Sequence, residues 1–128
     1  MRKRKILIIE DEQDLAEVNK YILQRAGYEI FVACDGKEGI EKFEEIKPDL
    51  VLLDIALPKI DGFEVLRILR NNYPEQQVPI IVFTVSILIN DSLRARKLGA
   101  TDYIVKTSDP KELLRKIENV LPEEYDDS

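Results

Sequence analysis

The chain has 128 residues, of which 45% are hydrophobic and 34% are charged, a balance typical of one globular domain. Its formal net charge of −6 argues against direct nucleic-acid binding, since domains that bind nucleic acids are ordinarily basic. The absence of histidine and the presence of one cysteine, Cys34, exclude histidine-dependent catalysis, an intramolecular disulfide and a cysteine-based zinc site. Any chemistry must therefore depend on carboxylates, hydroxyls and lysine.

The segment Met1-Arg2-Lys3-Arg4-Lys5 has the basic character of the start of a signal peptide. The apolar run that follows, Ile6–Ile9, is far shorter than the hydrophobic region of about 7–15 residues that such a peptide needs. No other apolar run approaches the roughly 20 residues that span a bilayer. We therefore expect a basic end that leads into a buried strand, a cytoplasmic location and no membrane association.

Five short runs that are rich in apolar and β-branched residues predict strands. They are Lys5–Ile9, Glu29–Ala33, Leu50–Leu53, Pro79–Thr84 and Asp102–Val105. The first, third and fourth are almost continuously apolar, which is typical of parallel strands that are covered on both faces. The second contains Glu29, which favours an edge position, and Cys34 follows it as a small residue at a strand end.

Stretches with a helical spacing of apolar residues follow each predicted strand. The apolar residues of these stretches lie within Leu15–Ala26, Ile40–Ile46, Phe63–Leu69, a shorter stretch from Asn90 or Asp91 to Leu98, and Leu113–Leu121. Gly27 is expected to end the first helix and Pro48 the second. The last helix has the clearest start, because Asp109 is suited to cap it and Pro110 to occupy its first position.

The alternation of strands and helices predicts an α/β fold in which helices cover both faces of one parallel sheet. We expect one domain over residues 1–122 and no internal repeat or linker. The last residues, 123–128, are acidic, and we expect this tail to be disordered.

The residues just after four of the predicted strands include three acids, a hydroxyl and a lysine. They are Glu10, Asp11, Asp54, Thr84 and Lys106. Each of them alone is common at a strand end, as a helix cap or a solvated side chain. Because the carboxyl ends of parallel strands share one edge of a sheet, however, all five are expected to meet there. Three packed acids repel one another without a cation, so this oxygen-rich set predicts a site for Mg²⁺ or Mn²⁺.

From Lys5 to about Leu121 the chain resembles the receiver domains of response regulators. The motifs that carry the resemblance are Glu10-Asp11, Asp54 with Leu57-Pro58 and Asp61-Gly62, Thr84, Gly99-Ala100 with Asp102-Tyr103, and Lys106. The resemblance implies a flavodoxin-like, doubly wound sheet of five parallel strands in the order 2-1-3-4-5, with five helices. It also implies a role in two-component, or phosphorelay, signalling.

The resemblance makes Asp54 the phosphoacceptor, with a phosphohistidine on a histidine kinase or a histidine phosphotransfer protein as the donor. It implies that Asp11 and Asp54 bind Mg²⁺ directly, Glu10 through water, and Ala56 through its backbone carbonyl. Lys106 would offset the charge that develops on the phosphoryl oxygens. Such a chain assists its own phosphorylation and dephosphorylation but is not a conventional turnover enzyme.

The resemblance also implies a conformational switch. The hydroxyl of Thr84 would bond to a phosphoryl oxygen, and Tyr103 would turn inward into the space that Thr84 leaves. The face made by the fourth helix, the fifth strand and the fifth helix would then change shape. We expect this face to bind a downstream protein or a second copy of the chain.

Four positions near the site depart from the family pattern, of which the first is Glu10, where an aspartate is commoner and where the longer side chain should still serve a contact through water. Thr107 follows Lys106 where the family has a proline after a cis bond, and the cost of roughly 3–4 kcal/mol for a cis bond before a non-proline residue favours a trans bond here. Val85 is bulkier than the small residue that usually follows Thr84. It could therefore narrow the access to Asp54.

The residues that flank the predicted phosphoacceptor offer little polarity. Neither Ala56 nor Ser86 has a side chain suited to position a hydrolytic water. We therefore expect a long-lived phosphoaspartate at Asp54.

Three consecutive apolar residues, Ile87-Leu88-Ile89, precede the predicted fourth helix, where a loop is ordinarily polar. They cannot all face inward on a helix, so we expect at least one to be exposed. This favours an interface.

Three other functions are open to the same residues. A receiver-like module that binds partners without phosphorylation is the main alternative, favoured by Val85 and Thr107 and opposed by the intact acids. A Mg²⁺-dependent hydrolase is disfavoured, because Ala56 stands where many aspartate-nucleophile phosphatases have a second acid. A nucleotide-binding flavodoxin or Rossmann domain is disfavoured, because its first loop needs glycines and this chain has Glu10-Asp11-Glu12.

Overall fold

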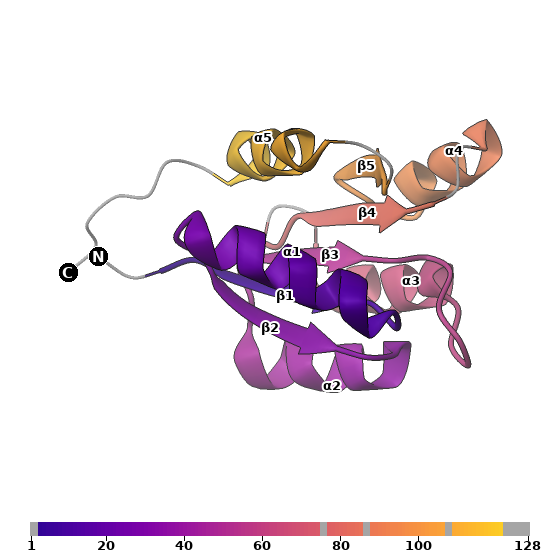
Figure 1. Cartoon of the computed structure of the whole chain (residues 1–128). Coiled ribbons are helices and arrows are strands. Elements are labelled where there is room, and N and C mark those ends of the chain that lie inside the picture. The colour runs from indigo at the N-terminus through magenta and orange to yellow at the C-terminus, as the bar shows by residue number, and fades with distance from the viewer. Residues whose placement is uncertain (1–2, 75–76, 86–87, 107–108, 122–128) are drawn as a thin grey trace.

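Five strands and five helices alternate along the chain in the computed structural model (Figure 1), which describes residues 3–74, 77–85, 88–106 and 109–121. In chain order they are β1 (Lys5–Ile9), α1 (Gln13–Arg25), β2 (Glu29–Ala33), α2 (Gly36–Ile46), β3 (Leu50–Leu53), α3 (Gly62–Asn72), β4 (Ile80–Thr84), α4 (Ile89–Lys97), β5 (Asp102–Val105) and α5 (Pro110–Val120). The expected acidic tail at 123–128 lies outside the described residues. Among the helices of the described part, none is long and apolar enough to cross a bilayer.

All strand pairs are parallel, and the sheet has the order β2-β1-β3-β4-β5. This confirms the order that the family resemblance implied, with β2 at an edge as its Glu29 indicated. The pairing register sets Ile9 beside both Ala33 and Leu53, and Thr84 beside Val105. Each strand is followed by a helix that returns the chain, so all strands end at one edge of the sheet (Figure 1).

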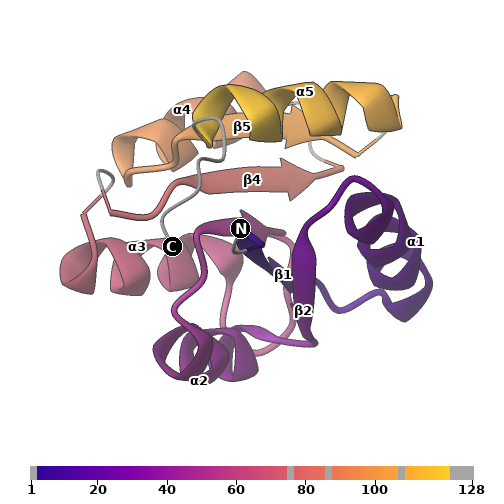
Figure 2. The same cartoon turned by 90° about the vertical axis from the view of Figure 1, so that its left-hand side faces the viewer.

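Two apolar layers, one on each face of the sheet, form the core (Figure 2). Alternate residues of β1 divide between them: Leu7 and Ile9 pack with residues of α2, α3 and α4, whereas Ile6 and Ile8 pack with residues of α1 and α5. Because both faces are covered, both sets of alternate side chains must be apolar. The continuous apolar runs in the sequence are therefore explained by burial on two faces.

Asp109 caps α5 as the sequence predicts, and two element boundaries differ slightly from those expected. Asp35, Asp61 and Asp109 each accept a hydrogen bond from a backbone N–H in the first turn of a helix. α4 begins at Ile89, one residue before the expected range, because the extended residue Leu88 is its N-cap. β4 begins at Ile80 and not at Pro79, because proline has no N–H for the strand ladder, although its carbonyl still accepts from Val51.

One buried side chain of α1 has a donor without a hydrogen-bond partner. Asn19 of α1 is 6% exposed, and its amide nitrogen has no hydrogen-bond partner within the described part of the chain. A buried donor that is left unsatisfied costs about 1–3 kcal/mol. The side chain of Asn19 therefore lowers the free energy of unfolding.

We predict that Asn19→Val raises the free energy of unfolding by about 1–2 kcal/mol, because valine removes the unsatisfied amide and has a helix propensity near that of asparagine. Urea unfolding followed by circular dichroism measures the change. Asn72→Val is the matched control, because Asn72 is exposed at the end of α3 and the change should stay within about 0.5 kcal/mol. A loss of stability in Asn19→Val would show that the amide contributes favourably.

Candidate functional site

Backbone hydrogen bonds fix the polar residues that follow the strands. The N–H of Glu10 donates to the carbonyl of Ala33 at 3.0 Å, and the N–H of Asp54 donates to the carbonyl of Ile9 at 3.1 Å. The N–H of Lys106 donates to the carbonyl of Thr84 at 2.8 Å. These bonds extend the sheet ladder by one step beyond the strands, so the residues that carry the expected chemistry begin from a rigid edge.

Three of the predicted site residues form an acidic cluster at this edge. Glu10, Asp11 and Asp54 each place a carboxylate oxygen within 4.8 Å of the others. Glu10 and Asp54 are buried, at 3% and 4% exposed, whereas Asp11 is exposed. Carboxylate oxygens are the ligands that a hard cation such as Mg²⁺ prefers, and the exposed Asp11 leaves the cluster open to solvent. The chemistry of this donor set therefore fits a magnesium ion.

Lys106 lies across the acidic cluster. Its Nζ is 2.8 Å from Asp54 Oδ2 and 2.5 Å from Glu10 Oε1, and its side chain is only 8% exposed. A threonine after Lys106 therefore does not prevent the ammonium group from reaching Asp54. The geometry of the Lys106–Thr107 bond lies outside the described residues.

Burial and charge act in opposite directions on the two partners of this contact. Burial raises the pKa of Glu10, although the bond from Lys106 and the N–H of Glu12 oppose the rise. Burial by itself would lower the pKa of Lys106, but the hydrogen bonds to Asp54 and Glu10 outweigh it and raise the pKa. Lys106 therefore remains an ammonium group at neutral pH and supplies the positive charge that the buried carboxylates need.

The loop after β3 turns sharply around Asp54. The N–H of Ala56 donates to Asp54 Oδ1 at 2.9 Å, and the N–H of Gly62 donates to the carbonyl of Ile55 at 3.1 Å. A Cβ atom on Gly62 would lie 2.2 Å from the Cα of Ile55 and 2.4 Å from the carbonyl oxygen of Asp54. Only glycine allows this approach. The Asp61-Gly62 motif therefore has a mechanical role, with Asp61 as the cap of α3 and Gly62 as the contact point.

Thr84 ends β4 and is fully buried. Its hydroxyl has no hydrogen-bond partner among the residues that the structure describes. A buried hydroxyl without a partner is unfavourable, and such positions are frequent at sites where a ligand or a modification completes the bonding. Val85 directly follows and is 64% exposed, whereas Ser86 lies outside the described residues.

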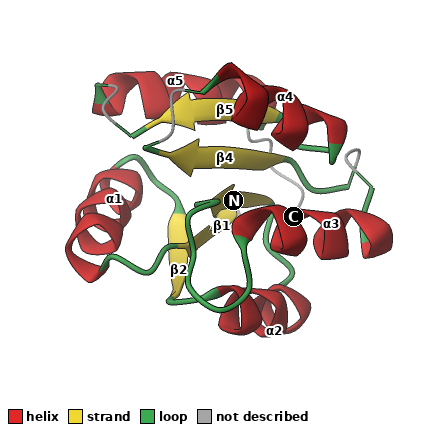
Figure 3. Ribbon diagram, turned by 90° about the vertical axis from the view of Figure 1, so that its right-hand side faces the viewer, coloured by secondary structure: helices red, strands yellow, loops and turns green. Residues whose placement is uncertain are grey.

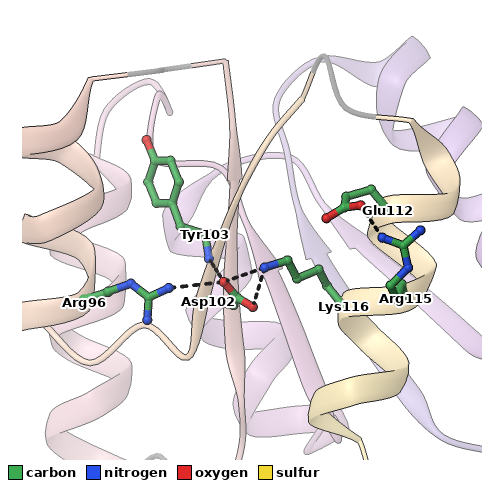
Figure 4. A network of polar contacts seen from close by, with 6 residues as sticks. All are labelled: Arg96, Asp102, Tyr103, Glu112, Arg115 and Lys116. Carbon is green, nitrogen blue, oxygen red and sulfur yellow. Dashed lines mark hydrogen bonds and ion pairs between the residues drawn. The ribbon is translucent and has the colours of Figure 1, made fainter.

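A charged network joins the three elements of the predicted switch face (Figure 4). Asp102 of β5 lies between Arg96 of α4, whose Nη2 is 3.4 Å from Oδ1, and Lys116 of α5, whose Nζ is 3.1 Å from Oδ2. Asp102 Oδ1 also accepts from the N–H of Tyr103 at 2.8 Å. Tyr103 itself is half-buried and packs against the core layer that includes α3 and α4.

Sequence reasoning did not find this network. In the sequence, Arg96 and Lys116 are ordinary surface cations, and Asp102 stands out only as part of a motif. The partners come from three elements, so no local spacing relates them. A weak signal existed in the acid at the start of a strand, because an acid there needs a partner or solvent.

The apolar segment before α4 is exposed in part, as expected. Leu88 is 64% exposed and Ile89 is 74% exposed, and Leu93 on the same helix is 59% exposed. Ile87 lies outside the described residues. α4 therefore presents apolar side chains beside the edge that carries the acidic cluster.

Comparison with known proteins gives a consistent result. Residues 6–118 match the family described as "Response regulator receiver domain". The chain is 41% identical over 121 residues to a protein of Porphyridium aerugineum named "Probable transcriptional regulator ycf27", covering 94% of this chain and 49% of that protein. It is 37% identical over 118 residues to the "Alkaline phosphatase synthesis transcriptional regulatory protein PhoP" of Bacillus subtilis, covering 92% of this chain and 48% of that protein.

Two solved structures show the same fold. A CheY-like receiver domain protein from Methanospirillum hungatei superposes with a TM-score of 0.86 at 32% identity, over 92% of this chain and 93% of that chain. The BeF3-activated N-terminal receiver domain of RstA from Klebsiella pneumoniae gives a TM-score of 0.86 at 33% identity, over 91% and 97% of the two chains. This chain spans about half the length of the curated relatives that it matches.

We predict that Lys106→Met lowers the free energy of unfolding by about 3 kcal/mol in metal-free buffer at pH 7, because it leaves two buried carboxylates without their cation. The double variant Glu10→Gln/Lys106→Met should lose at least about 1 kcal/mol less than the sum of the single losses, because glutamine removes one of those charges. Urea unfolding with a chelator present measures both.

Lys111→Met is the matched control for the loss of a lysine. Lys111 is exposed at the start of α5, and its change should stay within about 0.5 kcal/mol of the wild type. A Lys106→Met protein as stable as the control would mean that Lys106 does not hold the carboxylates together.

Proposed function

The chain belongs to the response regulator receiver domain family, and from this premise we propose that it accepts a phosphoryl group on Asp54 and uses it as a signalling switch. The donor is a phosphohistidine on a histidine kinase or a histidine phosphotransfer protein. The observation that carries the proposal is the position of Asp54, which is buried in an acidic cluster and bonded at 2.8 Å to the ammonium group of Lys106. Asp54 is also the acid of this cluster whose backbone carbonyl lies against Gly62 at the start of α3.

In the proposed transfer, a carboxylate oxygen of Asp54 attacks the phosphorus atom of the donor. The new O–P bond forms as the P–N bond to the donor histidine breaks, and the electron pair of that bond stays on the histidine nitrogen. Lys106 offsets the negative charge on the phosphoryl oxygens. The N–H of Ala56, which now donates to Asp54 Oδ1, holds the carboxylate in one orientation.

A magnesium ion fits the same site. Asp11 and Asp54 would hold it directly, with the backbone carbonyl of Ala56, while Glu10 would contact it through water. When bound, the ion would supply a second positive charge beside the phosphoryl oxygens. The burial of Glu10 and its contact with Lys106 support the indirect role, because this carboxylate already has a cationic partner.

The proposed switch begins at Thr84. Phosphorylation adds about 1.5–2 negative charges and three acceptor oxygens, and the buried hydroxyl of Thr84 has no competing bond to give up among the described residues. Movement of Thr84 would leave space into which the half-buried Tyr103 turns. Because Asp102 precedes Tyr103 and bonds to both α4 and α5, that movement would reach the whole α4-β5-α5 face (Figure 4). This face would then bind a downstream protein or a second copy of the chain.

We propose that the phosphoryl group is long-lived. Ala56 is exposed beside Asp54 and brings no polar side chain to position an attacking water. The exposed Val85 adds bulk beside Thr84 and so limits the path to the site. The chain would thus assist its own phosphorylation and dephosphorylation, the latter slowly, and would not turn over a substrate in the manner of a conventional enzyme.

Two expectations from the sequence remain predictions. The relatives above are named transcriptional regulators, and their names give no support to the absence of nucleic-acid binding in the longer proteins. The cytoplasmic location rests on the sequence alone.

We predict that incubation with Mg²⁺ and acetyl phosphate adds one phosphoryl group to the wild-type chain and none to Asp54→Asn, because asparagine lacks the nucleophilic oxygen. Intact-mass spectrometry measures the gain, and hydroxylamine should remove it. Asp49→Asn is the control for the loss of an acid, because Asp49 lies before β3 and bonds to the N–H of Lys5. Equal labelling of wild type and Asp54→Asn would place the acceptor elsewhere.

We predict that millimolar Mg²⁺ raises the unfolding temperature of the wild-type chain and that a chelator reverses the rise, because the ion binds the folded cluster and not the unfolded chain. Asp11→Asn should abolish the rise, since it removes the exposed ligand. Asp14→Asn, in the first turn of α1 outside the cluster, should keep it. Persistence of the Mg²⁺ effect in Asp11→Asn as well as in Asp14→Asn would point to general screening of the acidic surface.

A further inference from the structure

A second site lies between α3 and α4, apart from the acidic cluster (Figure 3). Residues of these two helices and of the loop before α3 line an open pocket of about 460 Å³. Ile60, Phe63 and Leu98 form its apolar surface. None of the residues that line it belongs to the cluster of Glu10, Asp11 and Asp54.

The guanidinium group of one arginine in this pocket lies over an aromatic ring. The guanidinium carbon of Arg94 is 4.1 Å from the centroid of the Phe63 ring, and Phe63 is itself fixed in the core at 7% exposed. A cation–π contact of this kind does not use the N–H groups of the guanidinium. No hydrogen bond or ion pair joins this guanidinium to another residue of the described part. Arg94 therefore presents guanidinium donors that have no acceptor among the described residues.

The other charges around the pocket leave a positive excess. Lys59, which the left-handed backbone of the loop holds at φ 65°, has only a 4.0 Å contact with Asp35 and is 78% exposed. The two acids of the pocket have partners already. Asp61 accepts from the N–H of Phe63 at 2.6 Å, and Glu64 is paired with Arg67. Arg94 and Lys59 are therefore the charges that remain available to a ligand.

We propose that the α3–α4 pocket binds a small oxyanion, a carboxylate or a phosphate ester, that carries a flat apolar group. The planar donors of Arg94 match the two oxygens of such an anion, and Lys59 adds charge at the rim. The apolar group lies against Ile60 and Leu98. Because the chain as a whole has a net charge of −6, this local arrangement, and not general attraction, accounts for the binding of an anion.

The experiment is a titration of the isotope-labelled full chain, without Mg²⁺, followed by ¹⁵N–¹H NMR. The probes are phenyl phosphate and benzoate, with inorganic phosphate and benzylamine for comparison. We expect phenyl phosphate or benzoate to shift the amides of Phe63, Glu64 and Arg94, with a dissociation constant on the order of 1 mM for so small a ligand. Phenyl phosphate and benzoate together show which oxyanion the pocket prefers.

Matched variants assign the binding to the pocket. Arg94→Gln should weaken it at least about tenfold, whereas Arg96→Gln should leave it unchanged, because Arg96 is on the same helix and equally exposed but bonds to Asp102. Lys59→Asn should weaken it without touching the contact between the helices, since asparagine tolerates a left-handed backbone. Neither Arg94 nor Lys59 belongs to the acidic cluster, so the result does not depend on phosphorylation of Asp54.

Three results would overturn the proposal. Equal binding by Arg94→Gln and wild type would show that the guanidinium is not the anion site. Stronger binding of benzylamine would show that Asp61 and Glu64 determine the charge preference. Inorganic phosphate as tight as phenyl phosphate would show that the apolar surface takes no part.

Discussion

The contact of Lys106 with two buried carboxylates is the interaction on which this site depends. Glu10 and Asp54 come from β1 and β3, which are neighbours in the sheet, and Lys106 reaches them from beyond β5, two strands away from β3. Two ionised carboxylates cannot be buried side by side at low cost unless a cation accompanies them. The ammonium group of Lys106 therefore stabilises the folded edge of the sheet. It also places a positive charge where a phosphoryl group on Asp54 would add negatively charged oxygens. One contact serves both stability and the proposed chemistry.

The sheet makes this contact possible through its order. A lysine two strands from its partner can reach it only if the strands between end at the same level, which the registers of β3, β4 and β5 provide. The tight turn at Gly62 then brings the start of α3 against Asp54, and the end of β4 buries Thr84 in the same edge. From this edge two helices leave, α3 after β3 and α4 after β4, and they meet again at the contact of Phe63 with Arg94. Phe63, which lines the α3–α4 pocket, therefore follows directly on the Gly62 contact with Asp54.

Among the described helices, α4 of the proposed switch face buries the fewest residues. Ala95 is the only fully buried residue of α4, whereas α3 buries five. α4 is held instead by polar contacts at its surface: Arg94 on Phe63 and Arg96 on Asp102. Helices with few buried apolar contacts are the ones that shift at low cost. The same helix and its N-cap expose Leu88, Ile89 and Leu93. A helix that shifts at low cost therefore also carries an apolar surface that a protein partner could cover.

The sequence by itself determined the elements and most of the edge. Apolar runs located the strands to within one residue, Gly27, Pro48 and Asp109 located three of the helix ends, and the order of β-α units required a parallel sheet whose polar termini meet. The strand order itself came from the family resemblance, because periodicity records burial but not which strand lies beside which. Only the tertiary structure decided the pairwise contacts: Lys106 with Glu10 and Asp54, Asp102 with α4 and α5, and Arg94 on Phe63. Each joins residues far apart in the chain, and their distances depend on register and helix packing, which no local pattern in the sequence encodes.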